Sequence, residues 1–282
     1  MSTPGATRRP RVMGIVNVTP DSFSDGGRHA GEAAVAHGLR LVEQGADILD
    51  VGGESTRPGA EPVGAAAEIA RVVPVIEGLR ARWPGPLSVD TMKPAVARAA
   101  AAAGATMWND VTALGWSPDA AEVAAELGCE VVLMHMQGEP RTMQVEPVYE
   151  DVVAEVTDWL IARAEAAMGA GIARERIWLD PGLGFGKTAA HNLALTAHLD
   201  RLVAAGFPVL YGASRKRTIR SVDPTAADPQ DRLGGSLALA LEAARRGADI
   251  VRVHDVRETA QALRLQAAVT EAVFGPGRLR ED

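Results

Sequence analysis

Short apolar runs alternate with longer, alanine-rich segments along almost the whole chain of 282 residues. The apolar runs are rich in Val, Ile and Leu, and they lie at 12–16, 47–51, 86–89, 106–108, 130–134, 177–179, 208–211 and 249–253. Because they are too short for helices and show little polar alternation, they predict parallel strands that are covered on both faces. The segments between them predict helices at 31–44, 64–82, 95–103, 118–127, 148–170, 189–205, 231–246 and 256–273.

Glycine follows several of the predicted helices, as expected where a left-handed C-cap ends a helix. These glycines are Gly45, Gly104, Gly128, Gly171, Gly206 and Gly247. Strands that alternate with helices predict a parallel sheet, either an open doubly wound sheet or a closed barrel. A count near eight without a break favours a single (β/α)8 TIM barrel of the α/β class. We expect a mobile N-terminal arm at 1–11, the barrel at 12–274 and a C-terminal tail at 275–282, because no linker divides the chain.

Composition narrows the function classes. The formal net charge of −7 argues against a general nucleic-acid or membrane-surface role. No segment approaches the roughly 20 apolar residues needed to span a membrane, and residues 1–11 lack the apolar stretch of a signal peptide. The single cysteine, Cys129, excludes an internal disulfide and a Cys-rich metal site. We expect Cys129 to be a buried strand residue and the protein to be cytoplasmic.

Polar residues follow one predicted strand after another, where parallel α/β folds place their ligand sites. In chain order they are Asn17, Asp90, Asn109, His135, Asp180, Ser214, Lys216, Arg252 and His254. Any one of the short polar side chains could simply cap the next helix. Together at one end of the fold they predict a cleft that reads a polar heterocycle through carboxylates and amides. The basic residues suit an anionic substrate or leaving group.

Two further motifs bear on phosphate and metal binding. Residues 182–188 end in Gly-Lys-Thr like a P-loop, but Pro181 occupies the position of the first glycine and has no N–H for a phosphate. The histidines show no spacing typical of a zinc site. A Mg²⁺ ion needs only one protein oxygen plus substrate phosphates and water, and Asn17 could supply that oxygen.

The motifs in this order closely resemble the dihydropteroate synthase family, from about Met13 to Ala268. They lie at 14–27, 52–59, 135–140, 180–187, 214–216 and 252–256. The resemblance implies that para-aminobenzoate displaces pyrophosphate from hydroxymethyl-dihydropterin diphosphate to give dihydropteroate. It also implies Mg²⁺ at Asn17 and a homodimer formed through helices near 231–273.

The resemblance assigns the residues to three groups. Asp90, Asn109, Asp180 and Lys216 would bind the pterin, whereas Arg252, His254 and Asn17 would take the diphosphate. Thr56, Arg57, Phe185 and Ser214 would line the aminobenzoate site. The catalytic set would be Asp90, Asp180, Lys216, Arg252 and His254. Two loops, at 17–30 and 52–66, would close over the substrates as lids that carry Asp21, Phe23, Ser24, Glu54 and Ser55.

Two alternatives remain open at this point. A pterin-binding methyltransferase shares the barrel and the pterin-reading acids, but it lacks the paired lid loops and the Ser-Arg-Lys motif. A non-catalytic relative would be expected to have lost Asp90, Lys216 or Arg252, and all three are present.

Overall fold

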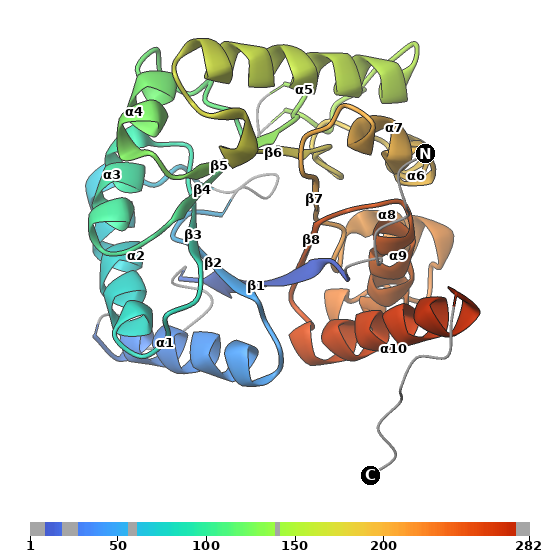
Figure 1. The fold of residues 1–282 in the computed structure, drawn as a ribbon, viewed down its shortest axis with the longest axis horizontal. Coiled ribbons are helices and arrows are strands. Elements are labelled where there is room, and N and C mark those ends of the chain that lie inside the picture. The colour runs from blue at the N-terminus through green and yellow to red at the C-terminus, as the bar shows by residue number, and fades with distance from the viewer. Residues whose placement is uncertain (1–8, 19–27, 56–60, 139–141, 275–282) are drawn as a thin grey trace.

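The computed structural model describes residues 9–18, 28–55, 61–138 and 142–274. Within this part of the chain, eight parallel strands form one sheet in the order β6-β5-β4-β3-β2-β1-β8-β7. The strands are β1 (Arg11–Asn17), β2 (Ile48–Gly52), β3 (Leu87–Asp90), β4 (Met107–Asp110), β5 (Glu130–Met134), β6 (Ile177–Asp180), β7 (Leu210–Tyr211) and β8 (Ile250–Val253). A parallel bridge between Leu179 and Val209 joins β6 to the chain just before β7 and brings the two sheet edges together. The fold is therefore the predicted TIM barrel, and Figure 1 looks into the ring of strands.

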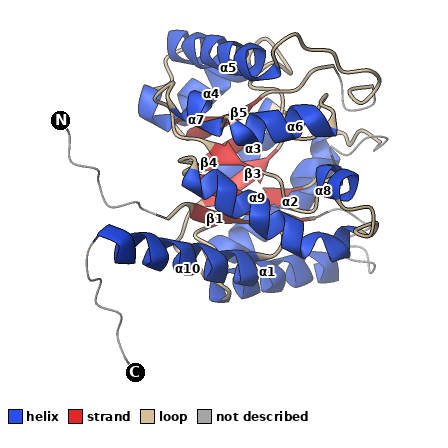
Figure 2. Cartoon of the chain, turned by 90° about the vertical axis from the view of Figure 1, so that its right-hand side faces the viewer, coloured by secondary structure: helices blue, strands red, loops and turns tan. Residues whose placement is uncertain are grey.

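Helices surround the strands on the outside, as the side view in Figure 2 shows. They are α1 (Arg28–Glu43), α2 (Ala65–Arg80), α3 (Pro94–Ala102), α4 (Ala120–Leu127), α5 (Val152–Gly169), α6 (Ala189–Ala197), α7 (Leu199–Val203), α8 (Arg217–Val222), α9 (Leu233–Arg245) and α10 (Val256–Phe274). Short 3₁₀ turns precede β6 and α9, at Arg174–Arg176 and Pro229–Arg232. All six glycines expected to end helices have positive φ, from 59° at Gly128 to 114° at Gly104. This confirms the C-cap prediction.

Most of the hydrophobic burial occurs in two clusters. A large cluster lies between the strands and the surrounding helices, for example Val51 of β2 with Val72 and Leu79 of α2. A separate cluster takes one residue from each strand except β3, namely Met13, Ile48, Met107, Val132, Trp178, Leu210 and Ile250. Inward-pointing residues of the strands fill the interior of a TIM barrel in layers. The second cluster is therefore the packed floor of the barrel. Two positions further along four of these strands lie polar residues, namely Asp50, Asn109, Asp180 and Arg252.

Several expectations about single elements need correction. The predicted helix 189–205 is broken at His198, where φ is −124°, so that α6 and α7 are separate helices. The short helix α8 was not predicted, and α5 begins at Val152 rather than at 148. Cys129 is only partly buried and directly precedes β5, so it is not the buried strand residue that we expected.

The N-terminal boundary also differs from the expected one. Arg11, assigned to the arm, is the first residue of β1. Arg9 forms a two-pronged ion pair with Asp47 at 2.9 and 3.0 Å. Residues 1–8 and 275–282 lie outside the described part of the chain.

Candidate active site

The strand register places four site positions in one row across the barrel mouth. Asn17 of β1 is the partner of Gly52 of β2, which pairs with Asp90 of β3, and Asp90 pairs with Asn109 of β4. Because parallel strands end at the same edge of a sheet, residues that are far apart in the sequence become neighbours. A Cβ built on Gly52 would lie 3.5 Å from Asp90 Cβ and 3.9 Å from Asn17 Oδ1, so these two side chains flank a glycine. The structure brings the predicted amide and carboxylate groups together.

Arg252 of β8 is the centre of a charged network at this row. Its Nε donates to Asp50 Oδ2 at 2.6 Å, and its Nη2 donates to Asp90 Oδ2 at 2.7 Å. Asp50 Oδ2 also accepts from Asn109 Nδ2 at 3.1 Å. The guanidinium thus spans two carboxylates that come from different strands.

Asp50 is a site residue that sequence reasoning missed. It lies in the middle of β2 with no exposed surface. The sequence did contain a signal, which is a carboxylate inside an otherwise apolar strand. A charge buried in this way needs a partner of opposite sign, and this need points to a site. Its second oxygen, Oδ1, is buried without a hydrogen-bond partner in the structure.

The network shifts the titration of its members. Burial raises the pKa of Asp90 to about 7, although Arg252 acts in the opposite direction, and Asp50 raises it further. Burial lowers the pKa of Arg252, but Asp50 and Asp90 outweigh this and hold it above its ordinary value. Asp90 therefore titrates near neutrality while the guanidinium stays charged.

Asp180 and Lys216 occupy the other side of the mouth. Asp180 ends β6, and its Oδ1 accepts from the backbone N–H of Gly182 at 2.7 Å. Lys216 donates to the carbonyl of Leu183, and its Nζ lies 4.9 Å from the centre of the Phe185 ring. Burial raises the pKa of Asp180, which Lys216 partly offsets. Burial likewise lowers the pKa of Lys216 to about 8, against the influence of Asp180.

Ser214 and His254 meet at the ends of β7 and β8. Ser214 Oγ lies 3.0 Å from His254 Nδ1, and it accepts from the His254 backbone N–H at 3.2 Å. The next residues along each segment, Arg215 and Asp255, form an ion pair. The predicted Ser-Arg-Lys and Arg-Val-His-Asp motifs are therefore joined side by side.

The base of the second predicted lid loop is tied to α2 and α3. Lys93 Nζ contacts Glu54 and also Glu68 Oε2, at 2.6 Å from the latter. Glu54 also accepts from the backbone N–H of Val63 at 2.8 Å. Burial lowers the pKa of Lys93, but hydrogen bonds to Glu54 and Glu68 outweigh it and raise the value. The sequence analysis assigned Glu54 to a moving lid and did not identify Lys93 or Glu68. Lys93 lies 39 residues from Glu54 and 25 residues from Glu68 along the chain, so no local pattern joins them.

Several predicted residues cannot be placed. Asp21, Phe23 and Ser24 of the first lid loop lie outside the described residues, and so do Thr56 and Arg57 of the second. Ser55 is described and is half-buried at the start of that gap.

The lysine of the P-loop-like sequence does not face a phosphate site. Lys187 is 2% exposed and contacts backbone carbonyls from two loops. The structure therefore agrees with the rejection of a P-loop. Among the described residues, no group of three or more His, Cys, Asp and Glu side chains could hold a metal ion.

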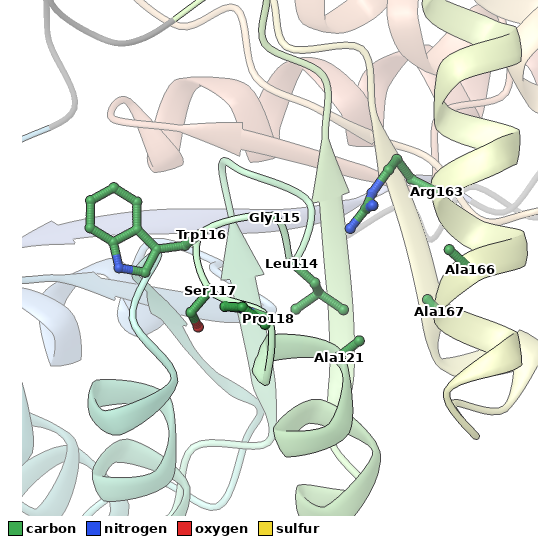
Figure 3. A pocket seen from close by; sticks show the side chains of 9 residues that line it. All are labelled: Leu114, Gly115, Trp116, Ser117, Pro118, Ala121, Arg163, Ala166 and Ala167. Atoms are coloured by element: carbon green, nitrogen blue, oxygen red, sulfur yellow. The ribbon is translucent and has the colours of Figure 1, made fainter.

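One surface hollow lies elsewhere, between the loop after β4 and helix α5 (Figure 3). Its lining is Leu114, Gly115, Trp116, Ser117, Pro118, Ala121, Arg163, Ala166 and Ala167. None of the predicted site residues belongs to it.

Among the described helices, none is long and apolar enough for a membrane span.

Comparisons with known proteins show the family of this chain. Residues 13–254 match the model of the family described as pterin binding enzyme. The chain is 50% identical over 264 residues to dihydropteroate synthase of Escherichia coli K12, covering 93% of each protein. It is 49% identical over 267 residues to that of Neisseria meningitidis serogroup B, again covering 93% of each.

Solved structures give the same result. Dihydropteroate synthase of Xanthomonas albilineans with 4-aminobenzoic acid has a TM-score of 0.87 and 57% identity, covering 94% of both chains. The complex of the same enzyme with 7,8-dihydropteroate has a TM-score of 0.83 and 54% identity, covering 94% of this chain and 95% of that one.

Proposed function

The chain belongs to the pterin-binding enzyme family and is a dihydropteroate synthase, and from this premise we propose how its residues divide the reaction. The enzyme joins para-aminobenzoate to hydroxymethyl-dihydropterin diphosphate and releases pyrophosphate. The observation that carries the division of roles is Arg252, fixed between Asp50 and Asp90 beside Asn109. The same network thus offers carboxylates to the pterin ring and a permanent cation to the diphosphate.

The pterin binds across the mouth, between the row that ends at Asn109 and the pair formed by Asp180 and Lys216. Carboxylates accept hydrogen bonds from ring N–H groups, whereas the amide and the ammonium can donate to ring acceptors. Asp90 and Asp180 have raised pKa values because of burial, so a ligand that donates N–H groups favours their ionised forms.

Charge development explains why the site has both signs. As the bond to the diphosphate breaks, the pterin methylene becomes positive and the leaving group gains negative charge. Asp90 stabilises the methylene electrostatically, and Arg252 and His254 receive the diphosphate. A neutral aniline attacks such a cation without a strong base, and the proton that its nitrogen then loses passes to the released pyrophosphate or to solvent. The reaction therefore needs no Ser–His or Cys–His nucleophile pair.

We assign Mg²⁺ to Asn17. Its Oδ1 and the Asp90 carboxylate flank Gly52, and oxygen ligands of this kind suit a hard cation that keeps water and phosphate ligands. When bound, Mg²⁺ would neutralise charge on the leaving diphosphate. Asn17 would orient the diphosphate toward Arg252.

Para-aminobenzoate occupies the outer part of the site, beside Phe185 and Ser214, with Thr56 and Arg57 completing it. The loops at 17–30 and 52–66 act as lids that exclude water, which competes for the cation. The ion pairs of Glu54 and Glu68 with Lys93 support this arrangement, because they give the second loop a fixed base.

We further propose a cytoplasmic homodimer formed through α9 and α10. Leu265 and Val269, one helical turn apart on α10, are 66% and 59% exposed, which supports an apolar contact surface on this helix. Light scattering during gel filtration tests this: we expect twice the 29.5 kDa chain mass, and Leu265→Glu should shift the protein toward the monomer. A wild-type monomer at micromolar concentration would contradict the proposal.

Pyrophosphate release, followed with a coupled pyrophosphatase, tests the division of roles. Release should require both substrates. Asn109→Ala should raise the KM for the pterin diphosphate, whereas Thr56→Ala should raise the KM for para-aminobenzoate, each by about tenfold or more for a lost hydrogen bond to a bound group. If both variants change the same KM, the assignment of the two subsites is wrong.

A further inference from the structure

Lys187 carries a buried amino group to which the proposed reaction gives no part. Its Nζ donates to three backbone carbonyls, those of His135 at 3.2 Å, Gly182 at 3.1 Å and Phe185 at 3.0 Å. It also lies 2.8 Å from His135 Nδ1. The residue is 2% exposed, so these contacts replace its hydration.

The atoms around Lys187 Nζ suit a hydrogen-bond donor. Burial, together with the neighbouring Lys187, lowers the pKa of His135 to about 3, so the imidazole is neutral and Nδ1 can accept a hydrogen bond. Burial lowers the pKa of Lys187 itself to about 7, against the attraction of Asp180. All four neighbouring atoms are acceptors. A protonated amine, which has three N–H donors, satisfies more of them than a neutral amine, which has two.

The segment around Lys187 lies directly against the chain that follows β5. A Cβ added to Gly182 would lie 1.9 Å from the carbonyl oxygen of His135, and one on Gly186 would lie 2.3 Å from that of Gln137. Both glycines also have positive φ, of 64° and 60°. The hydroxyl of Tyr149 closes the same junction by donating to the Gly186 carbonyl at 2.8 Å.

The loop held in this way carries groups of the substrate site. The Phe185 carbonyl binds Lys187, while the Phe185 ring lies under Lys216. The neighbouring carbonyl of Leu183 accepts from Lys216. The two lysines therefore hold the same loop, Lys187 from the buried side and Lys216 from the mouth.

We propose that Lys187 is a positioning residue that fixes the loop 181–186 against the chain after β5 and so presets Phe185 for para-aminobenzoate. The kinetic part of this inference rests on the proposed place of para-aminobenzoate beside Phe185. The positioning part rests only on the contacts of Lys187.

Lys187→Met keeps the length of the side chain and removes the charge and all its donors, whereas Lys187→Gln keeps two donors without the charge. In Lys187→Met we expect the KM for para-aminobenzoate to rise at least about tenfold while the KM for the pterin diphosphate changes less than about threefold, because small misplacements of a binding group cost large factors. Lys187→Gln should show a smaller rise. If Lys187→Met does not fold, Lys187→Gln carries the test.

Leu79→Ala is the matched control, because it destabilises the core at α2 without touching this loop. It should lower the melting temperature and leave both KM values in place. A folded Lys187→Met or Lys187→Gln enzyme with a wild-type KM for para-aminobenzoate would overturn the kinetic part.

Fluorine NMR separates the two parts and needs no substrate. The chain has 4 phenylalanines, so 4-fluorophenylalanine gives few signals, and Phe185→Leu assigns that of Phe185. The Phe185 resonance should shift or broaden in Lys187→Met and remain unchanged in Leu79→Ala. An unchanged resonance in Lys187→Met overturns the positioning role. If instead the resonance moves while Phe185→Leu leaves the KM for para-aminobenzoate unchanged, the proposed place of para-aminobenzoate is wrong.

Discussion

Substitution of Asp50 tests the charged network most sharply, because one of its oxygens binds two site residues. Asp50→Ala removes the acceptor of both Arg252 Nε and Asn109 Nδ2. Breaking a buried ion pair by removing one partner costs about 3–5 kcal/mol. Arg252 keeps its bond to Asp90 and has a 22% exposed side chain, so the lower end applies. We expect the free energy of unfolding to fall by about 3 kcal/mol.

Asp50→Asn should be milder, because its amide oxygen can take the position of Oδ2 and keep both hydrogen bonds. Hydrogen bonds to charged groups contribute roughly 1.5–3 kcal/mol and neutral ones roughly 0.5–1.5, so the expected loss is about 1–2 kcal/mol. In a chain of this size, 1 kcal/mol corresponds to about 2–4 °C in Tm. Urea unfolding and thermal melting measure both variants.

The same substitution should move the pH profile of pyrophosphate release. Asp90 must be ionised to stabilise the positive methylene, and its pKa is raised to about 7, first by burial and further by Asp50. Activity should therefore fall as the pH drops below about 7. Without the negative charge at position 50 the pKa of Asp90 is lower, so the acid limb of kcat/KM in Asp50→Asn should move to lower pH.

Asp47→Asn is the control, because Asp47 precedes the same strand but pairs with Arg9 and the backbone of Val12, away from the site. It should leave the acid limb in place. Asp50 does not hold the network together if Asp50→Ala unfolds at the wild-type urea midpoint, and it does not raise the pKa of Asp90 if Asp50→Asn keeps the wild-type acid limb.

Three further predictions concern the reaction itself. Asp90→Asn and Lys216→Ala should each lower kcat at least about tenfold, the scale of one fixed electrostatic group, and near-normal rates in both would remove these assignments. Burial lowers the pKa of Lys216 to about 8, so its positive charge is lost as the pH rises through that value, and kcat/KM should fall there. Lys216→Arg, which stays charged, should lack this basic limb even if it is slower, and an identical limb would point to another group. Removal of Mg²⁺ with EDTA should stop dihydropteroate formation, followed by chromatography because the coupling pyrophosphatase itself needs Mg²⁺. Asn17→Ala should need several-fold more Mg²⁺ to restore product formation, and an unchanged requirement would contradict the role of Asn17.

The strand boundaries agree with the sequence to within one or two residues, because a parallel strand that is buried on both faces appears in the sequence as a short continuous apolar run. The helices were less certain at their ends and breaks. The alanine-rich sequence 189–205 gives no local sign of the break at His198, where Leu199 and Leu202 enter the core. Helix α8 has only 6 residues, too few for a helical period to be visible.

The candidate site divides in the same way. Asn17, Asp90, Asn109 and Asp180 could be found from the sequence, because each stands at or within one residue of a strand's carboxyl end. Asp50 and Lys187 were missed as site residues, the first inside a strand and the second within a sequence that imitates a phosphate loop. Glu68 lies on α2 and Lys93 directly precedes α3, and no local pattern in the sequence reveals that the two side chains meet.

The sequence by itself determined the alternation of strand and helix, and with it the end of the barrel where the polar residues gather. Those features depend on short-range periodicity and on the common direction of parallel strands. Only the tertiary structure decided which charges meet. Arg252 reaches Asp90 across 162 residues and Asp50 across 202. These contacts exist because the closed barrel places β8 beside β1, so that side chains from β8, β2 and β3 point into the same interior. There a buried charge is stable only beside a charge of opposite sign.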